Sequence, residues 1–219
     1  MTFSLIGRCA RTGQFGAAVS TSNIAVGSRV PFVAPGIGAV LTQHRTDPRL
    51  GPRGLGLLRS GCTAQETVDA LVSSTSDHDW RQLAAIDAAG RTAVFHGAHV
   101  KPASGAGHAA DCIAIGNILA NDRVPQAMAD AFAADVGVHL AERLVRGLEA
   151  GLAAGGEHGP VFSASLLVVD REVFPLVDLR IDSGEEPIAR LRALWEEYTP
   201  WMEEFVVRAV EPNRAKGAS

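Results

Sequence analysis

The chain has 219 residues, of which 47% are hydrophobic and 20% charged, enough to bury a substantial core in one large domain. Its formal net charge is -4 and it has only two lysines, Lys101 and Lys216, so no basic face is expected to bind nucleic acid. No apolar run approaches the roughly 20 residues of a membrane helix. No signal peptide is evident, so we expect a cytoplasmic protein.

The first part of the chain has the alternation of apolar residues that is typical of strands. Strands are predicted at 2–9 and 15–19, joined by a turn at 11–14 as a hairpin. Because strand side chains alternate, Thr2 and Ser4 should share one face. A third strand is predicted at 36–42, and the polar residues 43–48 after it are expected to form a loop.

The middle of the chain alternates groups of helices with groups of strands. A short helix is expected at 54–59, and the capping-box pattern Thr63 to Glu66 opens another. The remaining predictions, in chain order, are strands at 82–87, 92–95 and 112–119, helices at 125–132 and 140–148, and strands at 163–169 and 176–181. Hairpin-like links within each strand group disfavour a doubly wound parallel fold. The order predicts an α+β fold in which two antiparallel sheets pack face to face with helices outside.

The C-terminal segment has a helical pattern. Apolar residues recur at spacings of three and four from Ile188 to Phe205, and Pro200 should divide the segment into two helices. This stripe either packs on its own domain or forms a dimer seam. We therefore divide the chain into a domain at 1–185 and a helical extension of that domain at 186–219, with residues 212–219 expected to fray.

Familiar cofactor motifs are missing, including a phosphate loop and a dinucleotide fingerprint, so no cofactor is expected. His96, His99, His108 and Asp111 have side chains that bind metals. However, two histidines three residues apart suit a metal best on a helix, and these end a strand. We therefore expect polar loop histidines and no metal site.

Thr2 has the chemistry of an N-terminal nucleophile. An initiator Met before a small residue is commonly removed, and a free Thr2 would carry both a hydroxyl and an α-amino group. Such an amine titrates near pH 8 and acts as a base toward its own hydroxyl. Polar residues at predicted strand ends or beside glycines are further candidates: Ser4, Ser22, Gln43, Arg81, Asn117 and Glu157. For Asn117 and Glu157 an ordinary turn is the alternative interpretation.

Short segments in order along the chain resemble one family, domain of unknown function 1028 (DUF1028). They are Thr2-Phe3-Ser4-Leu5, Ala25-Val26-Gly27, Gly36-Ile37-Gly38-Ala39-Val40, Thr42-Gln43, Asp47-Pro48, Gly51-Pro52-Arg53-Gly54-Leu55, Arg81-Gln82, Ala106-Gly107-His108, Gly116-Asn117-Ile118-Leu119, Gly155-Gly156-Glu157 and Asp178-Leu179-Arg180. The resemblance runs from Thr2 to about residue 198. It implies a fold similar to the N-terminal-nucleophile (Ntn) hydrolases, a four-layer αββα sandwich, and amide hydrolysis with Thr2 as nucleophile.

The chain departs from the pattern of that fold in two places. The proteasome-like branch also uses an Asp and a Lys near the nucleophile, and neither residue type occurs between Thr2 and Arg45. Arg49 and Arg81 are the candidate replacements for the cation. The Gly-Gly-Asp-x-Arg-Gly stretch common in the family keeps its carboxylate as Glu157 but lacks the Arg.

These observations lead to two hypotheses of different class. In the first, the protein is an amidohydrolase acting on a small amide or short peptide-like metabolite, and it forms a homodimer or higher homo-oligomer. Its catalytic residues are Thr2, Ser4, Ser22 and Asn117, and its substrate-binding residues are Gln43, Arg81, His108 and Glu157. In the second, the protein is a non-catalytic small-ligand-binding protein on the same Ntn-hydrolase-like scaffold.

Overall fold

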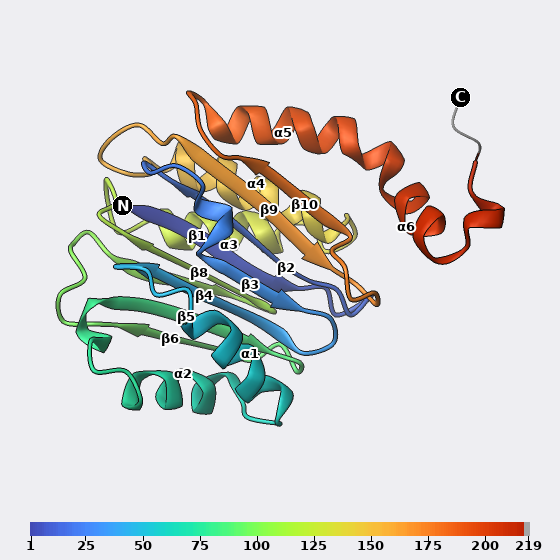
Figure 1. Ribbon diagram of the computed structural model, residues 1–219. Helices are drawn as coiled ribbons and strands as arrows, with labels where there is room; N and C mark the ends of the chain where they lie inside the picture. Colours follow the sequence, from blue (N-terminus) through green and yellow to red (C-terminus); the bar gives the residue numbers. More distant parts are fainter. Residues whose placement is uncertain (217–219) are drawn as a thin grey trace.

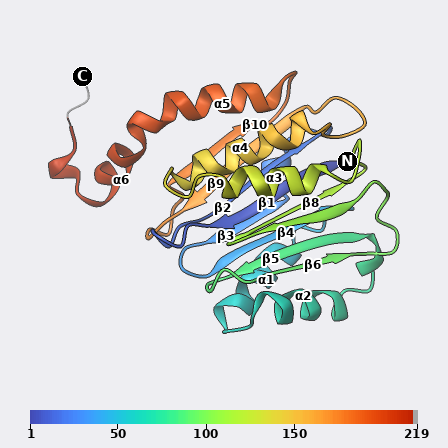
Figure 2. The ribbon, with the colours of Figure 1, turned by 180° about the vertical axis from the view of Figure 1, so that it is seen from behind.

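The fold is a sandwich of two antiparallel sheets between two layers of helices (Figures 1 and 2). It is seen in a computed structural model that describes residues 1–216, and these contain ten strands and six α-helices. The α+β class and the four-layer αββα arrangement predicted from the sequence are confirmed. No helix within residues 1–216 combines the length and apolar character needed to cross a membrane.

The larger sheet has six strands with the N-terminal strand near its centre. Its order is β10-β9-β2-β1-β8-β7. The strands are β1 (Thr2–Arg8), β2 (Phe15–Thr21), β7 (Gly105–Ala109), β8 (Cys112–Asn117), β9 (Ser163–Val169) and β10 (Val177–Ile181). The β1–β2 hairpin pairs Phe3 with Ser20, and β8 places Asn117 opposite Thr2. The start of β1 is therefore flanked on both sides by strand ends.

The smaller sheet has four strands in the order β3-β4-β5-β6. They are β3 (Pro31–Ala34), β4 (Gly38–His44), β5 (Arg81–Asp87) and β6 (Thr92–His96). Helices α1 (Leu50–Arg59) and α2 (Ala64–Ser73) cover its outer side, and Thr63 caps α2 with the predicted capping box. The outer side of the larger sheet is covered by α3 (Val124–Ala133) and α4 (Leu140–Ala153).

Alternation along β1 divides its side chains between two cores. Phe3 and Leu5 lie in the core beneath α3 and α4. Ile6 lies in the core between the sheets, together with Leu41 from the facing sheet and Ile115 from the neighbouring strand β8. Thr2 and Ser4 have the same parity as Ile6, so they face the space between the sheets, as the alternation predicts.

Two strands and several boundaries differ from the sequence predictions. The pattern missed β3 and β7, and β7 has the sequence Gly-Ala-Gly-His-Ala, whose residues have little strand propensity. Gln43 and His44 continue β4 instead of starting a loop, because they pair with Gln82 and Arg81 of β5. Helix α1 begins at Leu50, four residues before its predicted start.

The C-terminal segment forms α5 (Pro187–Tyr198) and α6 (Met202–Val210), and Pro200 lies in the 3-10 turn that separates them. Ile188, Leu191 and Trp195 are buried in the core shared with β9 and β10, so this part of the stripe packs on its own domain. Figure 1 shows α6 extending beyond the sandwich. Residues 212–214 form a 3-10 turn where fraying was expected, and residues 217–219 lie outside the described residues.

Candidate active site

Polar side chains gather on the inner face of the larger sheet where β1 begins. Oγ1 of Thr2 lies 3.3 Å from Oγ1 of Thr21 at the end of β2, and Asn117 is the partner of Thr2 on β8. All three residues are buried. Beyond Ser4 the side chains on the same face are apolar. This end of the sheet therefore presents hydroxyl and amide groups at a place where packing alone would favour apolar residues.

The peptide bond between Met1 and Thr2 lies against these hydroxyls. The side chains of Thr2 and Thr21 both donate hydrogen bonds to the carbonyl oxygen of Met1. The Thr2 hydroxyl is therefore next to the bond whose cleavage would free the α-amino group of the same residue.

Glu157 brings a carboxyl group to the amino terminus. It follows α4 after Gly155 and Gly156, whose φ angles of 125° and 57° suit glycine. Its Oε2 accepts a hydrogen bond of 3.2 Å from the backbone N–H of Ser22, and its Oε1 is buried with no partner among residues 1–216. Burial raises the pKa of Glu157 to about 7, while the charge of the terminal amine and the Ser22 hydrogen bond oppose this rise.

In the same environment the pKa of the terminal amine shifts in the opposite direction. Burial lowers the pKa of the Met1 α-amino group from its ordinary value of 8.0; Glu157 opposes the decrease and Lys101 adds to it. The pKa values of the Glu157 carboxyl and the Met1 amine thus move toward each other.

A network of buried hydrogen bonds, mostly between side-chain amides, connects this end of the larger sheet to the smaller sheet. Ser4 donates to Oε1 of Gln43 at 2.7 Å, and Nε2 of Gln43 donates to Oε1 of Gln82 at 2.6 Å. Asn117 donates to the same Gln82 oxygen at 2.8 Å, and Gln82 donates to the Gly116 carbonyl at 2.8 Å. These bonds join the two sheets and fix the side chain of Asn117 beside Thr2. Oδ1 of Asn117 is buried and has no partner within the described chain.

A cavity of about 440 Å³ opens over Thr2, within the size range of small-molecule pockets. Its described lining residues are Met1, Thr2, Thr21, Asn23, Val26, Arg29, Val30, His44, Arg45, Thr46 and Arg81. This lining contains three arginines and no Asp or Glu. The cavity over the proposed nucleophile is therefore positively charged.

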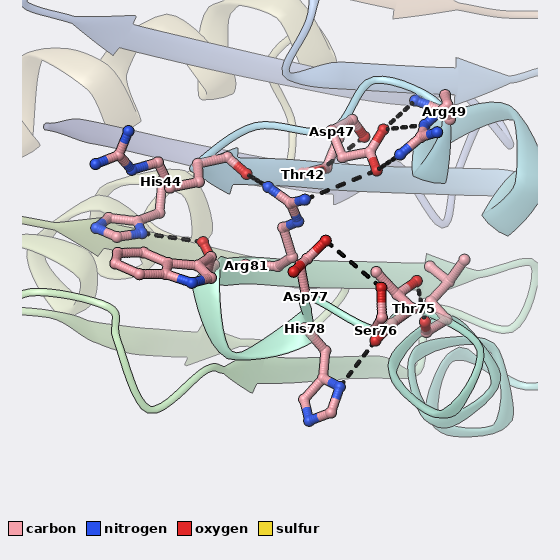
Figure 3. A network of polar contacts seen from close by, with 12 residues as sticks. Thr42, His44, Asp47, Arg49, Thr75, Ser76, Asp77, His78 and Arg81 are labelled. Carbon is pink, nitrogen blue, oxygen red and sulfur yellow. Dashed lines mark hydrogen bonds and ion pairs between the residues drawn. The ribbon is translucent and has the colours of Figure 1, made fainter.

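Arg81 lines the cavity. Figure 3 shows the neighbours that hold its guanidinium. Its guanidinium donates to the Arg45 carbonyl and lies 4.0 Å from the Asp47 carboxylate. Asp47 is also paired with Arg49 at 2.7 Å, and hydrogen bonds from Arg49 lower the pKa of the Asp47 carboxyl. Arg81 also lines a second cavity of about 270 Å³. Arg81 is therefore fixed in place, with one carboxylate already beside it.

Most residues predicted for the site lie around the amino terminus. Thr2 and Arg81 line the cavity, and the network of buried hydrogen bonds contains Ser4, Gln43 and Asn117. Ser22 and Glu157 also meet, since the backbone N–H of Ser22 donates to Glu157 and hydrogen bonds from Ser22 oppose the rise in the pKa of Glu157.

His108 is not brought to this site. It pairs with Ile113 on β8, opposite Ile6 and well along the sheet from Thr2. Its side chain is exposed, and its backbone N–H bonds to Gln126 of α3 at 3.1 Å. The register of β7, a strand that the sequence pattern missed, sets this position, so the structure gives His108 no contact with the proposed nucleophile.

Within the part of the chain that the structure describes, no group of His, Cys, Asp or Glu side chains is arranged to hold a metal. The residues that the sequence singled out have separate environments. His96 bonds to Gln82 at 2.7 Å, and the His99 ring packs against Trp80 at a tilted angle. Asp111 pairs with Arg8 at 2.9 Å.

Sequence reasoning missed Thr21, Gln82, Arg29 and Arg45. Thr21 had a usable signal, because the hairpin register that pairs Phe3 with Ser20 also puts Thr21 beside Thr2. Gln82 also had one, as a polar residue in a strand otherwise rich in Ala, Leu and Ile. The two arginines lie outside the strands, so no periodicity marks them.

Fold and site together define a four-layer αββα sandwich protein with a threonine at the head of a central strand and a cationic cavity above it. A model of a family of unknown function, DUF1028, matches residues 2–191, so the chain belongs to this family. The crystal structure of protein SPO2555 from Silicibacter pomeroyi, described with the same family, is similar with a TM-score of 0.84 and 32% identity. The match covers 90% of this chain and 86% of that one.

Two further solved structures have lower similarity. Anbu, an ancestral beta-subunit, from Yersinia bercovieri has 11% identity and a TM-score of 0.40, with 99% of each chain covered. An Anbu (Gly-1) mutant from Hyphomicrobium sp. has 14% identity and a TM-score of 0.44, covering 94% of this chain and 99% of that one. No curated protein matches the chain.

Proposed function

We propose that the protein is an amidohydrolase of the N-terminal-nucleophile type, acting on a small or short peptide-like amide, with Thr2 as the nucleophile after removal of Met1. The observation that carries the proposal is the position of the Thr2 hydroxyl in the lining of the cavity and beside the Met1 carbonyl. Once Met1 is removed, Thr2 carries both the attacking oxygen and the amine that accepts its proton.

The proposed reaction has two steps. Oγ1 of Thr2 attacks the amide carbonyl carbon while the α-amino group takes the hydroxyl proton, giving a tetrahedral intermediate. The intermediate expels the amine of the substrate, which leaves with that proton, and an acyl ester on Thr2 remains. Water then attacks the ester, and the carboxylic acid is released as the threonine hydroxyl is restored. No metal or redox partner is needed to balance either step.

Neighbouring groups support these steps. Thr21 donates to the Met1 carbonyl here, and loss of Met1 frees this donor for the oxyanion of the intermediate. Glu157 is buried and its charge acts on the Met1 amine, and we expect its carboxylate to stabilise the protonated α-amino group of Thr2 once Met1 is removed. Asn117 is a positioning residue for Thr2. Its side chain is held by Gln82, which is bonded to Gln43, and Gln43 is bonded to Ser4.

The first test is an intact-mass measurement on native protein, which should show that Met1 is absent. Retention of Met1 in every molecule would remove the mechanism. A panel of small amides is then assayed with wild type, Thr2→Ala and Thr2→Ser. Thr2→Ala should abolish turnover and Thr2→Ser should keep part of it. Thr12→Ala, an exposed change in the β1–β2 turn, should act like wild type.

A second candidate function is non-catalytic binding of a small ligand. The cavity favours it in one respect, because its described lining offers neither the Asp nor the Lys that proteasome-like enzymes place near their nucleophile. A binding protein would show no turnover. Its melting temperature would rise equally with ligand in wild type and Thr2→Ala, and this pair of results would replace the first proposal.

A further inference from the structure

The cavity over Thr2 differs in charge from the chain as a whole. The chain has 24 acidic and 20 basic residues, yet the described lining of this cavity has three arginines and no carboxylate. Arg29, Arg45 and Arg81 come from separate segments of the chain, so only the tertiary structure brings them together. A cavity lined by one sign of charge concentrates ligands of the opposite sign.

Arg29 is fixed in place but lacks a counter-charge. Its Nη1 donates to the carbonyl oxygens of Ile24 at 2.6 Å and Ala25 at 2.7 Å. Among residues 1–216 it forms no ion pair, and its Nε and Nη2 donate to no protein group. Burial lowers the pKa of this guanidinium, so the charge is partly desolvated without compensation. An oxyanion in the cavity would supply the missing partner.

Arg45 offers a second guanidinium that no carboxylate neutralises. Its Cζ lies 5.3 Å from the centre of the Trp80 ring, a cation–π contact that orients the side chain and leaves its N–H groups free. It forms no ion pair within the described part of the chain. Arg81 differs, because it already lies near Asp47 and bonds to the backbone of Arg45. Arg29 and Arg45 are thus the two cations available to a ligand.

We propose, building on the proposed function, that the amide substrate carries a second, anionic group, a carboxylate or a phosphate-type oxyanion, which Arg29 and Arg45 bind while the amide lies over Thr2. Guanidinium groups match such oxyanions with paired, charge-assisted hydrogen bonds. A neutral amide would fill the same space and leave both cations unpaired. N-acylated amino acids are the simplest compounds that combine these two features.

The test measures binding to Thr2→Ala protein, so that no turnover interferes. Calorimetry compares three forms of each amide: N-acylglycine, the matching N-acylaminomethylphosphonate and the neutral N-acylglycinamide, with acetyl, butyryl and benzoyl as acyl groups. At least one anionic form should bind about tenfold or more tightly than its neutral partner, as expected for a charge-assisted contact. The carboxylate and phosphonate arms distinguish the two kinds of oxyanion. If no anionic form binds better than its neutral partner, the proposal is overturned.

Variants locate the anion site. Arg45→Gln and Arg29→Gln should each weaken binding of the anionic form about tenfold and leave the neutral amide unchanged. Arg45 is exposed, so its replacement should not disturb folding. Arg171→Gln, in the turn after β9 with a side chain 86% exposed, is the matched control and should change nothing. Unchanged anion binding in both test variants would contradict the assignment.

The two proposals fail in different ways. Selective binding of the anionic forms together with no amide turnover by wild type would refute the hydrolase and leave the anion site in place. Turnover of neutral amides as efficient as that of their anionic partners would refute the anion site and leave the hydrolase in place.

Discussion

The pKa of Glu157 depends strongly on the surroundings of its buried side chain. Its side chain is 6% exposed, and one carboxylate oxygen has no partner among the described residues. The compensation comes from the charge of the amino terminus and from hydrogen bonds of Ser22. Burial outweighs both effects, so the carboxyl group titrates near neutral pH, where a proton-transferring group is most useful.

The same shift predicts a pH-dependent contribution to stability. Because burial raises the folded-state pKa of Glu157 from 4.5 to about 7, the folded protein binds this proton more tightly than the unfolded chain does. The contribution of protonated Glu157 to the free energy of unfolding is complete below pH 4.5, the pKa of this group in the unfolded chain. It is lost as the pH rises through the folded-state pKa of about 7. Glu157→Gln should therefore leave the free energy of unfolding unchanged at acidic pH and raise it by up to about 3 kcal/mol at pH 8.

Urea unfolding of wild type and Glu157→Gln at several pH values measures this difference. Glu196→Gln, on the exposed side of α5, corrects for the loss of one charge. A difference between Glu157→Gln and wild type that stays the same from pH 4 to pH 8 would contradict the raised pKa.

Other single residues show what the sequence can and cannot predict. Alternation alone places Thr2 and Ser4 on one face, because side-chain direction in a strand is a local property. The polar sequence around Gln43 predicts a loop, whereas its strand conformation depends on pairing with Gln82, 39 residues away. Substrate binding by His108 stays a prediction, and the register of β7 places this residue well along the sheet from Thr2.

At the scale of elements, Gly107 determines how closely α3 approaches β7. A Cβ atom added at Gly107 would lie 2.2 Å from the carbonyl oxygen of Pro125 in α3, a distance that real contacts do not allow. The helix backbone would have to move. Overpacking of this kind costs about 1–3 kcal/mol, so Gly107→Ala should lower the free energy of unfolding by about that amount.

The same strand supplies a matched control for this prediction. A Cβ at Gly105 would meet nothing within 4 Å, so Gly105→Ala should change stability by less than about 1 kcal/mol. Chemical denaturation of both variants makes the comparison. Equal stability of the two variants would show that α3 does not pack on β7 as described.

Elements with a strong local signal are predicted from the sequence, and those without one are missed. Helix α2 has such a signal in the Thr63 capping box, which the structure contains. Strand β7 is rich in Gly and Ala and is a strand because β8 offers it a backbone to pair with. Tertiary context overrides propensity in such cases.

For the whole molecule, the C-terminal helices contribute to the main core. Ile188, Leu191, Trp195 and Met202 are buried against the six-stranded sheet or its helices. Full burial of each such side chain contributes about 1.5–3 kcal/mol, and the sum is comparable to the roughly 5–15 kcal/mol that stabilises a typical domain. A chain that ends at residue 186 should therefore lose cooperative unfolding and bind a hydrophobic dye.

A shorter truncation is the control for this experiment. Ending the chain at Val210 removes the 3-10 turn at 212–214, whose residues are exposed, and should keep the melting temperature within a few degrees. Calorimetry and dye binding of both truncated chains test the expectation. Wild-type melting of the chain that ends at 186 would show that α5 and α6 are dispensable.

The expected homodimer or higher oligomer stays a prediction. One side of the C-terminal stripe is used within the chain, but Trp201 is 51% and Phe205 is 41% exposed. Light scattering of the purified protein is the direct measurement, and a monomer at micromolar concentration would contradict the expectation.

The sequence by itself determined the types of most elements, the α+β class and the inner face that carries Thr2 and Ser4. These follow from periodicity, capping and alternation, which act between neighbouring residues. Only the tertiary structure decided which segments meet at that face. It joined Ser4 and Asn117 to Gln43 and Gln82 across two sheets, and it gathered Arg29, Arg45 and Arg81 around one cavity. Contacts between residues so far apart in the chain depend on how whole layers pack, and no local pattern in the sequence encodes that packing.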